Sequence, residues 1–456
     1  MSAVIDAPAT VIVDPQGTVD DLQIRQRSLA VLAQILRVVG ALAIVGSMSA
    51  FLLQGWSVGN DVQRYLLLLA QTALLTGAGF ALSHGLKETR GARVFFGLAL
   101  VSVPANFTIL GALMYSAFQL DGAMGQYPSF ASWQVVDAAS ASITLLGALV
   151  ALVPLSLLCF AIMARRSAQA LTLHLLVLNS LLLIPARSAT SVGVMVLIGV
   201  AYALWATARL IRRNGALATP EGRFALSVLF APLIIVVVRS LNFYPVSATL
   251  LALLCVSAFL VLRHVSLWAQ SRRNLSVGLD ALSLPIAIGA ASLVEVALQN
   301  AFGNMPISPV FALTLGLLGW DVIRRTASRP LAGIVGLIVS ALIAMSLLVN
   351  LYVEDSVGYA LICVVAGLVA VLSGYFVNHK GVLFIGVITS VLGLASGAED
   401  LTAMVLNSGW VELLIGGATI IAVASVVERH GVTLRLKIKQ WAETARRRRS
   451  RVLADT

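Results

Sequence analysis

Residues 331–353 read LAGIVGLIVSALIAMSLLVNLYV, a stretch that contains no charged side chain. A helix needs roughly 20 apolar residues to cross the hydrocarbon core of a bilayer, because each residue adds about 1.5 Å along its axis. This stretch therefore predicts a membrane-spanning helix. Similar apolar runs, separated by short polar breaks, continue in both directions along the chain.

The composition excludes a soluble protein. Of 456 residues, 59% are hydrophobic and only 11% are charged, whereas a soluble domain carries about 25% charged residues. The high apolar content also excludes a disordered chain. No ten-residue segments alternate apolar and polar side chains, as the strands of a membrane barrel would. The sequence predicts an all-α polytopic integral membrane protein.

The apolar runs divide the chain into a polar segment 1–28, a transmembrane helical domain 29–427 and a basic tail 428–456. We expect about fourteen spans, at 29–53, 65–84, 94–118, 139–163, 169–186, 190–209, 224–243, 245–263, 277–301, 305–323, 331–353, 357–377, 381–397 and 409–427. The two spans separated at Asn242–Pro245 and the short span 381–397 are each also compatible with a kinked or re-entrant helix.

Basic residues predict the orientation of these spans. With fourteen crossings, every Lys and Arg except Arg37, Arg64, Arg187 and Arg239 falls on one side of the membrane. Loops that remain in the cytoplasm are enriched in Lys and Arg. We therefore expect both termini to be cytoplasmic in a multi-pass protein of the inner membrane. The same rule explains the net charge of +11 without a nucleic-acid partner.

The tail 428–456 has an amphipathic pattern followed by a polybasic run. Leu434, Ile438, Trp441 and Ala445 share one helical stripe. The basic run contains Arg446, Arg447, Arg448 and Arg449. One interpretation is a helix held on the inner leaflet by anionic lipid headgroups. The alternative is a charge cluster that only stops translocation.

Glu295 is the most deeply placed carboxylate, because apolar-rich sequence extends on both sides of it. Ionisable side chains inside a membrane are costly and commonly functional. Together with Arg239 and the outward Arg187, Glu295 is a candidate to line a substrate cavity, since Arg binds phosphate and carboxylate in bidentate geometry. The alternative is a Glu295–Arg239 pair that only joins two helices.

Amides and prolines add to this candidate cavity. Asn106 lies beside Pro104, Asn179 lies ahead of Pro185, and Pro285 precedes Glu295. Proline frees a backbone carbonyl, and transporters place such broken helices at their substrate sites. Asn106 and Asn179 are therefore further candidate substrate-binding residues.

The sequence offers little support for an enzyme. Cys159, Cys255 and Cys363 lie far apart in apolar runs, so we expect no metal site, disulfide or cofactor. The outward acidic pairs Glu354–Asp355 and Glu399–Asp400 would suit a membrane glycosyltransferase, but no large outward loop is present to shape an acceptor site. Hydrolase, zinc-protease and phosphate-loop motifs are also absent.

The leading hypothesis is a transporter or flippase for an amphipathic or anionic solute, such as a lipid-linked saccharide or an exported metabolite. A non-catalytic membrane subunit that scaffolds an envelope or polysaccharide-assembly complex, with other envelope proteins as partners, is the main alternative. A transporter should have a polar cavity that reaches the midplane, whereas a scaffold should have a solid, apolar bundle interior.

Overall fold

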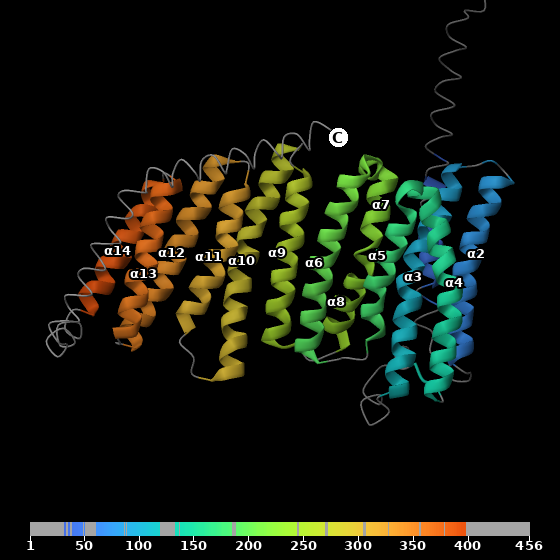
Figure 1. Cartoon of the computed structure of the whole chain (residues 1–456), viewed down its shortest axis with the longest axis horizontal. Helices are drawn as coiled ribbons and strands as arrows, with labels where there is room; N and C mark the ends of the chain where they lie inside the picture. Colours follow the sequence, from blue (N-terminus) through green and yellow to red (C-terminus); the bar gives the residue numbers. More distant parts are fainter. Residues whose placement is uncertain are drawn as a thin grey trace, which may run out of the picture. The chain divides into compact units, whose positions relative to one another are not determined.

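The structure is a computed structural model. It describes residues 32, 35–36, 39–48, 50, 61–85, 87, 89–118, 133–135, 137–184, 188–243, 246–269, 272–303, 307–326, 328–354, 357–377 and 379–397. All regular structure within these residues is helical (Figure 1). The labelled α-helices are α2 (Asp61–His84), α3 (Thr89–Phe118), α4 (Ala138–Ala164), α5 (Ala168–Leu183), α6 (Ala189–Arg213), α7 (Pro220–Val228), α8 (Ala231–Phe243), α9 (Ala248–Trp268), α10 (Arg273–Phe302), α11 (Ile307–Arg325), α12 (Arg329–Glu354), α13 (Val357–Val377) and α14 (Lys380–Ser396).

The helices agree with the expected membrane spans over most of the chain. Each expected segment from 65–84 to 381–397 coincides with one helix, or, for 224–243, with the pair α7 and α8. Eight stretches of the described residues are long and apolar enough to cross a membrane by themselves, or nine with the bent pair. The chain is thus a multi-pass membrane protein. The count of fourteen spans and the side of each terminus stay predictions.

The separation expected at Asn242–Pro245 agrees with the structure, in which α8 ends at Phe243 and α9 begins at Ala248. α7 and α8 meet at an angle of 44°, and the break falls at Leu229–Phe230, ahead of the Asn242–Pro245 position. Span 224–243 is therefore a bent pair. Span 409–427 lies outside the described residues, and span 29–53 is described only in part.

Short polar side chains mark where several helices begin. Asp137, Ser188 and Ser247 accept hydrogen bonds from backbone N–H groups in the first turns of α4, α6 and α9. Thr219 does the same for α7, whose first residue is Pro220. These caps satisfy N–H groups that have no partner within the helix, and proline is tolerated at its first position.

The chain divides into two compact units, Met1–Thr172 and Leu173–Thr456, with the boundary inside α5. In the first unit, α3 packs on α2 and α4. The most apolar part of α3 is 67% buried, compared with 28% for α2. α3 is therefore the helix enclosed by its neighbours in this unit, whereas most of the α2 surface is not covered by protein.

In the second unit, successive helices α9, α10, α11 and α12 pack on their neighbours in sequence, and α6 packs on α9 (Figure 1). One apolar core lies between α9, α10, α11 and α12. It contains the buried residues Phe259, Ala287, Ala291, Leu315, Val322, Val335 and Val339. These contacts hold together the helices that carry the charged residues described below.

Glycines bring α13 and α14 into backbone contact. A Cβ atom at Gly386 would lie 2.6 Å from the backbone nitrogen of Val371, and one at Gly374 would lie 2.5 Å from that of Leu383. Only glycine permits such an approach. Small residues at helix interfaces allow close packing where lipid supplies no hydrophobic driving force.

Candidate functional site

The second unit contains a buried ionic cluster between α9, α10 and α11. Arg263 of α9 forms an ion pair with Asp280 of α10, and each side chain is only 2% exposed. Asp280 also accepts hydrogen bonds from Ser266 of α9 and, over 2.7 Å, from Thr326 just after α11. Both carboxylate oxygens of Asp280 are therefore satisfied by groups from its two neighbouring helices.

The same arginine also binds α11. The Nε atom of Arg263 donates to the Oδ2 atom of Asp321 over 3.1 Å, and its Nη2 atom donates to the Asp321 carbonyl over 3.3 Å. Arg325 pairs with the other oxygen of Asp321 over 2.8 Å. The cluster thus extends from the enclosed Asp280 to the half-exposed Arg325.

This cluster is balanced in charge, since two arginines face two aspartates. Removing two charges from water is costly, and the cost is recovered only when geometry and additional hydrogen bonds are good. Here the Arg263 guanidinium donates hydrogen bonds to α10 and α11. The hydroxyl groups of Ser266 and Thr326 donate the remaining hydrogen bonds to the Asp280 carboxylate. The arrangement joins three helices at one end, where α9 and α11 finish and α10 begins.

Asp280 lies near the cytoplasmic end of the expected span 277–301, where the sequence predicts that water can reach it, and no role was expected for Asp321. Arg263 is the last residue of the expected span 245–263, whereas α9 continues to Trp268 and the Arg263 side chain is buried. One signal was available: Asp321 and Arg325 have the i, i+4 spacing of a helical ion pair. The link of Arg263 to both aspartates depends on how three helices pack and has no sequence signature.

Glu295 lies on the same helix as Asp280. The two residues are fifteen positions apart in α10, or roughly 22 Å along a helix axis. Unlike the Asp280 oxygens, the buried Oε1 atom of Glu295 has no hydrogen-bond partner among the described residues. Pro285 lies between the two acids. α10 therefore carries one fully bonded carboxylate and one with an unused acceptor.

Two arginines, Arg239 and Arg187, were expected to lie near Glu295. Arg239 lies on α8, which packs on α6, whereas α10 packs on α9 and α11. Pairing of Glu295 with Arg239 stays a prediction. Arg187 lies outside the described residues.

Asn106 lies in the first unit, in a polar cluster between α2 and α3. Its Nδ2 atom donates to the hydroxyl of Thr72 over 2.8 Å and to the Ser102 carbonyl over 2.9 Å. Ser102 also donates to Thr72 over 3.0 Å. The buried Oδ1 atom of Asn106 accepts no hydrogen bond within the described part of the chain. Its amide is thus held in place with one acceptor unused.

Asn179 of α5 is fully buried in the second unit. Neither its Nδ2 nor its Oδ1 atom has a hydrogen-bond partner among residues that the structure describes. Unsatisfied buried polar groups are rare, and each requires an explanation such as a functional role. Among the candidate residues, Asn179 and Glu295 are therefore the ones whose unsatisfied buried atoms most favour a functional role.

Other expected features fall beyond the described ranges. These are Arg446 to Arg449 in the tail, the acidic pair Glu399–Asp400, and Asp355 of the other acidic pair. Within those ranges, no cluster of three or more His, Cys, Asp or Glu side chains could hold a metal ion.

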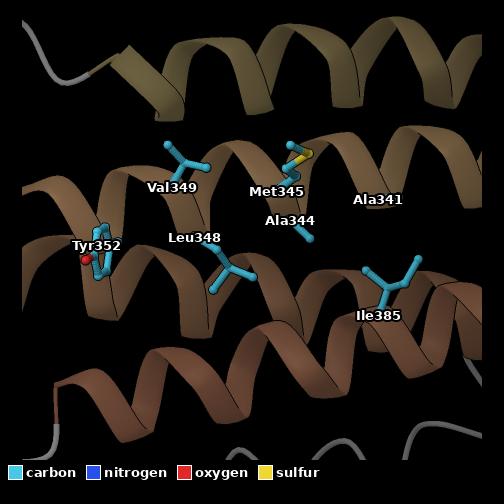
Figure 2. A pocket seen from close by; sticks show the side chains of 7 residues that line it. All are labelled: Ala341, Ala344, Met345, Leu348, Val349, Tyr352 and Ile385. Carbon is cyan, nitrogen blue, oxygen red and sulfur yellow. The ribbon is translucent and has the colours of Figure 1, made fainter.

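A hollow of about 540 Å³ lies on the surface of α12 and α14, and Figure 2 shows the side chains that line it. It is lined by Ala341, Ala344, Met345, Leu348, Val349, Tyr352 and Ile385. The lining is apolar apart from the Tyr352 hydroxyl, and it includes none of the candidate residues.

The chain was also compared with known proteins. No protein family, no curated protein and no solved structure matches it.

Proposed function

We propose that the protein is a transporter or flippase for an amphipathic or anionic solute, with α10 as the helix that carries its essential acids. The proposal is supported above all by the buried Oε1 atom of Glu295, which has no hydrogen-bond partner among the described residues. An ionisable group within a membrane-spanning helix is costly and commonly serves substrate or ion movement. A substrate donor would satisfy this oxygen.

The ionic cluster adds a second element to this proposal. Transport requires that a bundle open at alternate ends, and charge pairs that join helices at one end can close it. Arg263 joins α9, α10 and α11 at the end opposite to Glu295 on α10. Pro285 lies between the two and weakens the intervening helical hydrogen bonding. α10 would then carry both Asp280, which closes one end of the bundle, and Glu295, which contacts the substrate nearer the other end.

A scaffold within an envelope complex is the second candidate. The observation in its favour is the complete bonding of Asp280, which is typical of a fixed helix junction. The described hollow in Figure 2 is also apolar and lies apart from the charged residues. A membrane enzyme is a weaker candidate, because it is supported only by the expected outward acidic pairs.

The test is translocation of a fluorescent polyprenyl-phosphate saccharide in proteoliposomes, measured by quenching from outside. The wild-type protein should accelerate translocation relative to protein-free vesicles. Glu295→Gln should fold but translocate at least several-fold more slowly, because the amide keeps the side-chain shape and removes the titratable charge. Asn300→Ala, a change of an exposed polar residue on the same helix, is the matched control and should behave as the wild type.

Two results would contradict the transport proposal. If the wild-type protein does not move this probe or a soluble anionic metabolite, the scaffold is favoured. If Glu295→Gln melts early and the added change Arg239→Gln restores the melting temperature, the two side chains form a structural pair.

A further inference from the structure

Three exposed tryptophans share one sequence relationship in the second unit. Trp205, Trp268 and Trp320 are 48%, 44% and 48% exposed, respectively. Each is followed four residues later by an exposed arginine: Arg209, Arg272 and Arg324. The remaining described tryptophan, Trp133, is buried and lies in the first unit, beneath the guanidinium of Arg64. The repeated Trp-x-x-x-Arg pattern therefore belongs to tryptophans on the outside of the bundle.

All three pairs lie at the same end of this unit. The C-terminal parts of α9 and α11 meet there, because Arg263 bonds Asp321. α6 runs parallel to α9, since Gly193 near the start of α6 packs against Leu253 near the start of α9. The C-terminal ends of α6, α9 and α11 accordingly lie together, as Figure 1 also shows.

Trp205 and Trp320 mark the ends of exposed apolar stripes. On α6, exposed Val194 and Ile198 precede Trp205 on one helical face, and on α11, Leu313 and Leu317 precede Trp320. Tryptophan favours the boundary between hydrocarbon and headgroups, because its ring is apolar and its indole N–H is polar. Arg209 and Arg324 lie one helical turn beyond their tryptophans and therefore at headgroup depth, whereas Arg272 lies past the end of α9, at the start of α10.

The first pair also shows side-chain contact. The guanidinium of Arg209 lies 5.2 Å from the centroid of the Trp205 ring, within the range of a cation–π contact. His174 of α5 contacts the edge of the same indole and shares a 2.7 Å hydrogen bond with Tyr202. Indole, imidazole, phenol and guanidinium groups thus gather at one surface patch.

We propose that these three Trp-x-x-x-Arg pairs bind the phosphate groups of anionic phospholipids in the leaflet at this end of the protein. Arginine donates to phosphate in bidentate geometry, while the tryptophan ring rests against the upper acyl chain and glycerol region. Lipid is the occupant because Arg209 and Arg324 directly continue apolar, exposed helix surfaces, and Arg272 follows the exposed Val265 and Trp268 at the end of α9. A soluble phosphate compound has no acyl chains that could contact these apolar surfaces.

The test uses the purified full-length protein and native mass spectrometry, with phosphatidylglycerol as the probe and phosphatidylcholine as the neutral comparison. The triple variant Arg209→Gln, Arg272→Gln and Arg324→Gln should bind phosphatidylglycerol more weakly by about fivefold at each site, the equivalent of about 1 kcal/mol per arginine. Its affinity for phosphatidylcholine should change little.

A matched triple variant separates these sites from a general effect of positive charge. Arg213→Gln, Arg273→Gln and Arg329→Gln remove the same charge from exposed arginines at the same end, none of which follows a tryptophan by four residues. This variant should retain phosphatidylglycerol as the wild type does. Equal losses in both triple variants, or no loss in either, would overturn the proposal. Equal competition by inorganic phosphate and by phosphatidylglycerol would also overturn it, since the sites would then bind soluble anions.

The tryptophans supply an independent measurement. Trp205→Leu, Trp268→Leu and Trp320→Leu, combined in one variant, keep every charge and should still weaken phosphatidylglycerol binding. If folding is disturbed, binding is compared at a temperature below the melting transition of each variant. Unchanged binding by the folded variant would contradict the role of the pairs.

Discussion

Arg263 of α9 and Asp280 of α10 form an ion pair whose two side chains are each 2% exposed, and Arg263 reaches Asp321 of α11 at the same time. A single guanidinium thus connects three membrane helices. Removing one partner from such a cluster leaves the other charge buried without compensation.

Arg263→Met should therefore lower the free energy of unfolding by about 3–5 kcal/mol, and the additional change Asp280→Leu should restore much of the loss. Denaturation in detergent micelles measures both. Arg325→Gln is the control, because Arg325 is 48% exposed and forms an i, i+4 pair with Asp321; pairs of this type contribute about 0.3–0.5 kcal/mol. Equal losses of unfolding free energy in Arg263→Met and Arg325→Gln would show that burial does not determine how much each ion pair contributes to stability.

Asn179→Leu should raise stability and impair transport. The buried amide has no partner among the described residues, so replacing it with an apolar group of similar size removes an unfavourable desolvation of about 1–3 kcal/mol. Asn106→Leu is the contrast, because the Asn106 amide donates two hydrogen bonds and its loss should destabilise the protein. Melting temperatures in detergent and translocation assays measure these effects. A destabilised Asn179→Leu protein would mean that the amide is bonded in solution.

Gly386→Ala should separate α13 from α14. The added Cβ atom would lie 2.6 Å from the Val371 backbone nitrogen, and forced backbone shifts of this kind cost about 1–3 kcal/mol. Gly289→Ala in α10 is the matched change, since nothing lies within 4 Å of its Cβ position. The latter should be neutral or stabilise the helix by up to about 1 kcal/mol. Thermal unfolding distinguishes the two variants, and equal melting temperatures would refute the backbone contact.

The cap formed by Asp137 at the start of α4 should make the stability of the protein depend on pH. Hydrogen bonds from Ser140, including its backbone N–H over 2.7 Å, hold the pKa of the Asp137 carboxyl below its ordinary value. A lowered folded-state pKa contributes stability above the pKa of the unfolded chain, and this contribution is lost as pH falls through the folded-state pKa.

Asp137→Asn should cap the helix without titrating. Between about pH 5 and about pH 3, the melting temperature of the wild type should fall further than that of the variant. Parallel pH profiles would show that this cap does not contribute through its charge.

The expected orientation is tested by reporter fusions. A reporter after Thr456 and one between α6 and α7 should be cytoplasmic, whereas one between α3 and α4 should lie on the opposite side, because Lys and Arg gather at the first two positions. Activity of a periplasm-dependent reporter fused after Thr456 would contradict an even number of crossings.

Most of the helical structure could be predicted from the sequence, because each membrane helix satisfies its own backbone hydrogen bonds and requires a long apolar run. Residues 331–353 predicted α12 to within two residues, since Arg329 and Glu354 are polar and border the run. The separation expected at Asn242–Pro245 matches the boundary between α8 and α9, whereas the bend at Leu229–Phe230 was not expected. The bend lies inside one apolar run, and the hydropathy pattern has no break at that position.

The sequence by itself determined that the protein is a membrane protein and where its apolar helices lie. It also determined that a few polar residues, such as Glu295 and Asn179, lie within those helices. Only the tertiary structure decided which of those groups are bonded. Asp280 and Glu295 share α10, yet one accepts from Arg263, Ser266 and Thr326, while the other keeps a buried oxygen without a partner among the described residues. The reason is physical: apolar length depends on consecutive residues, whereas the bonding of a buried charge depends on which side chains neighbouring helices bring within about 3 Å.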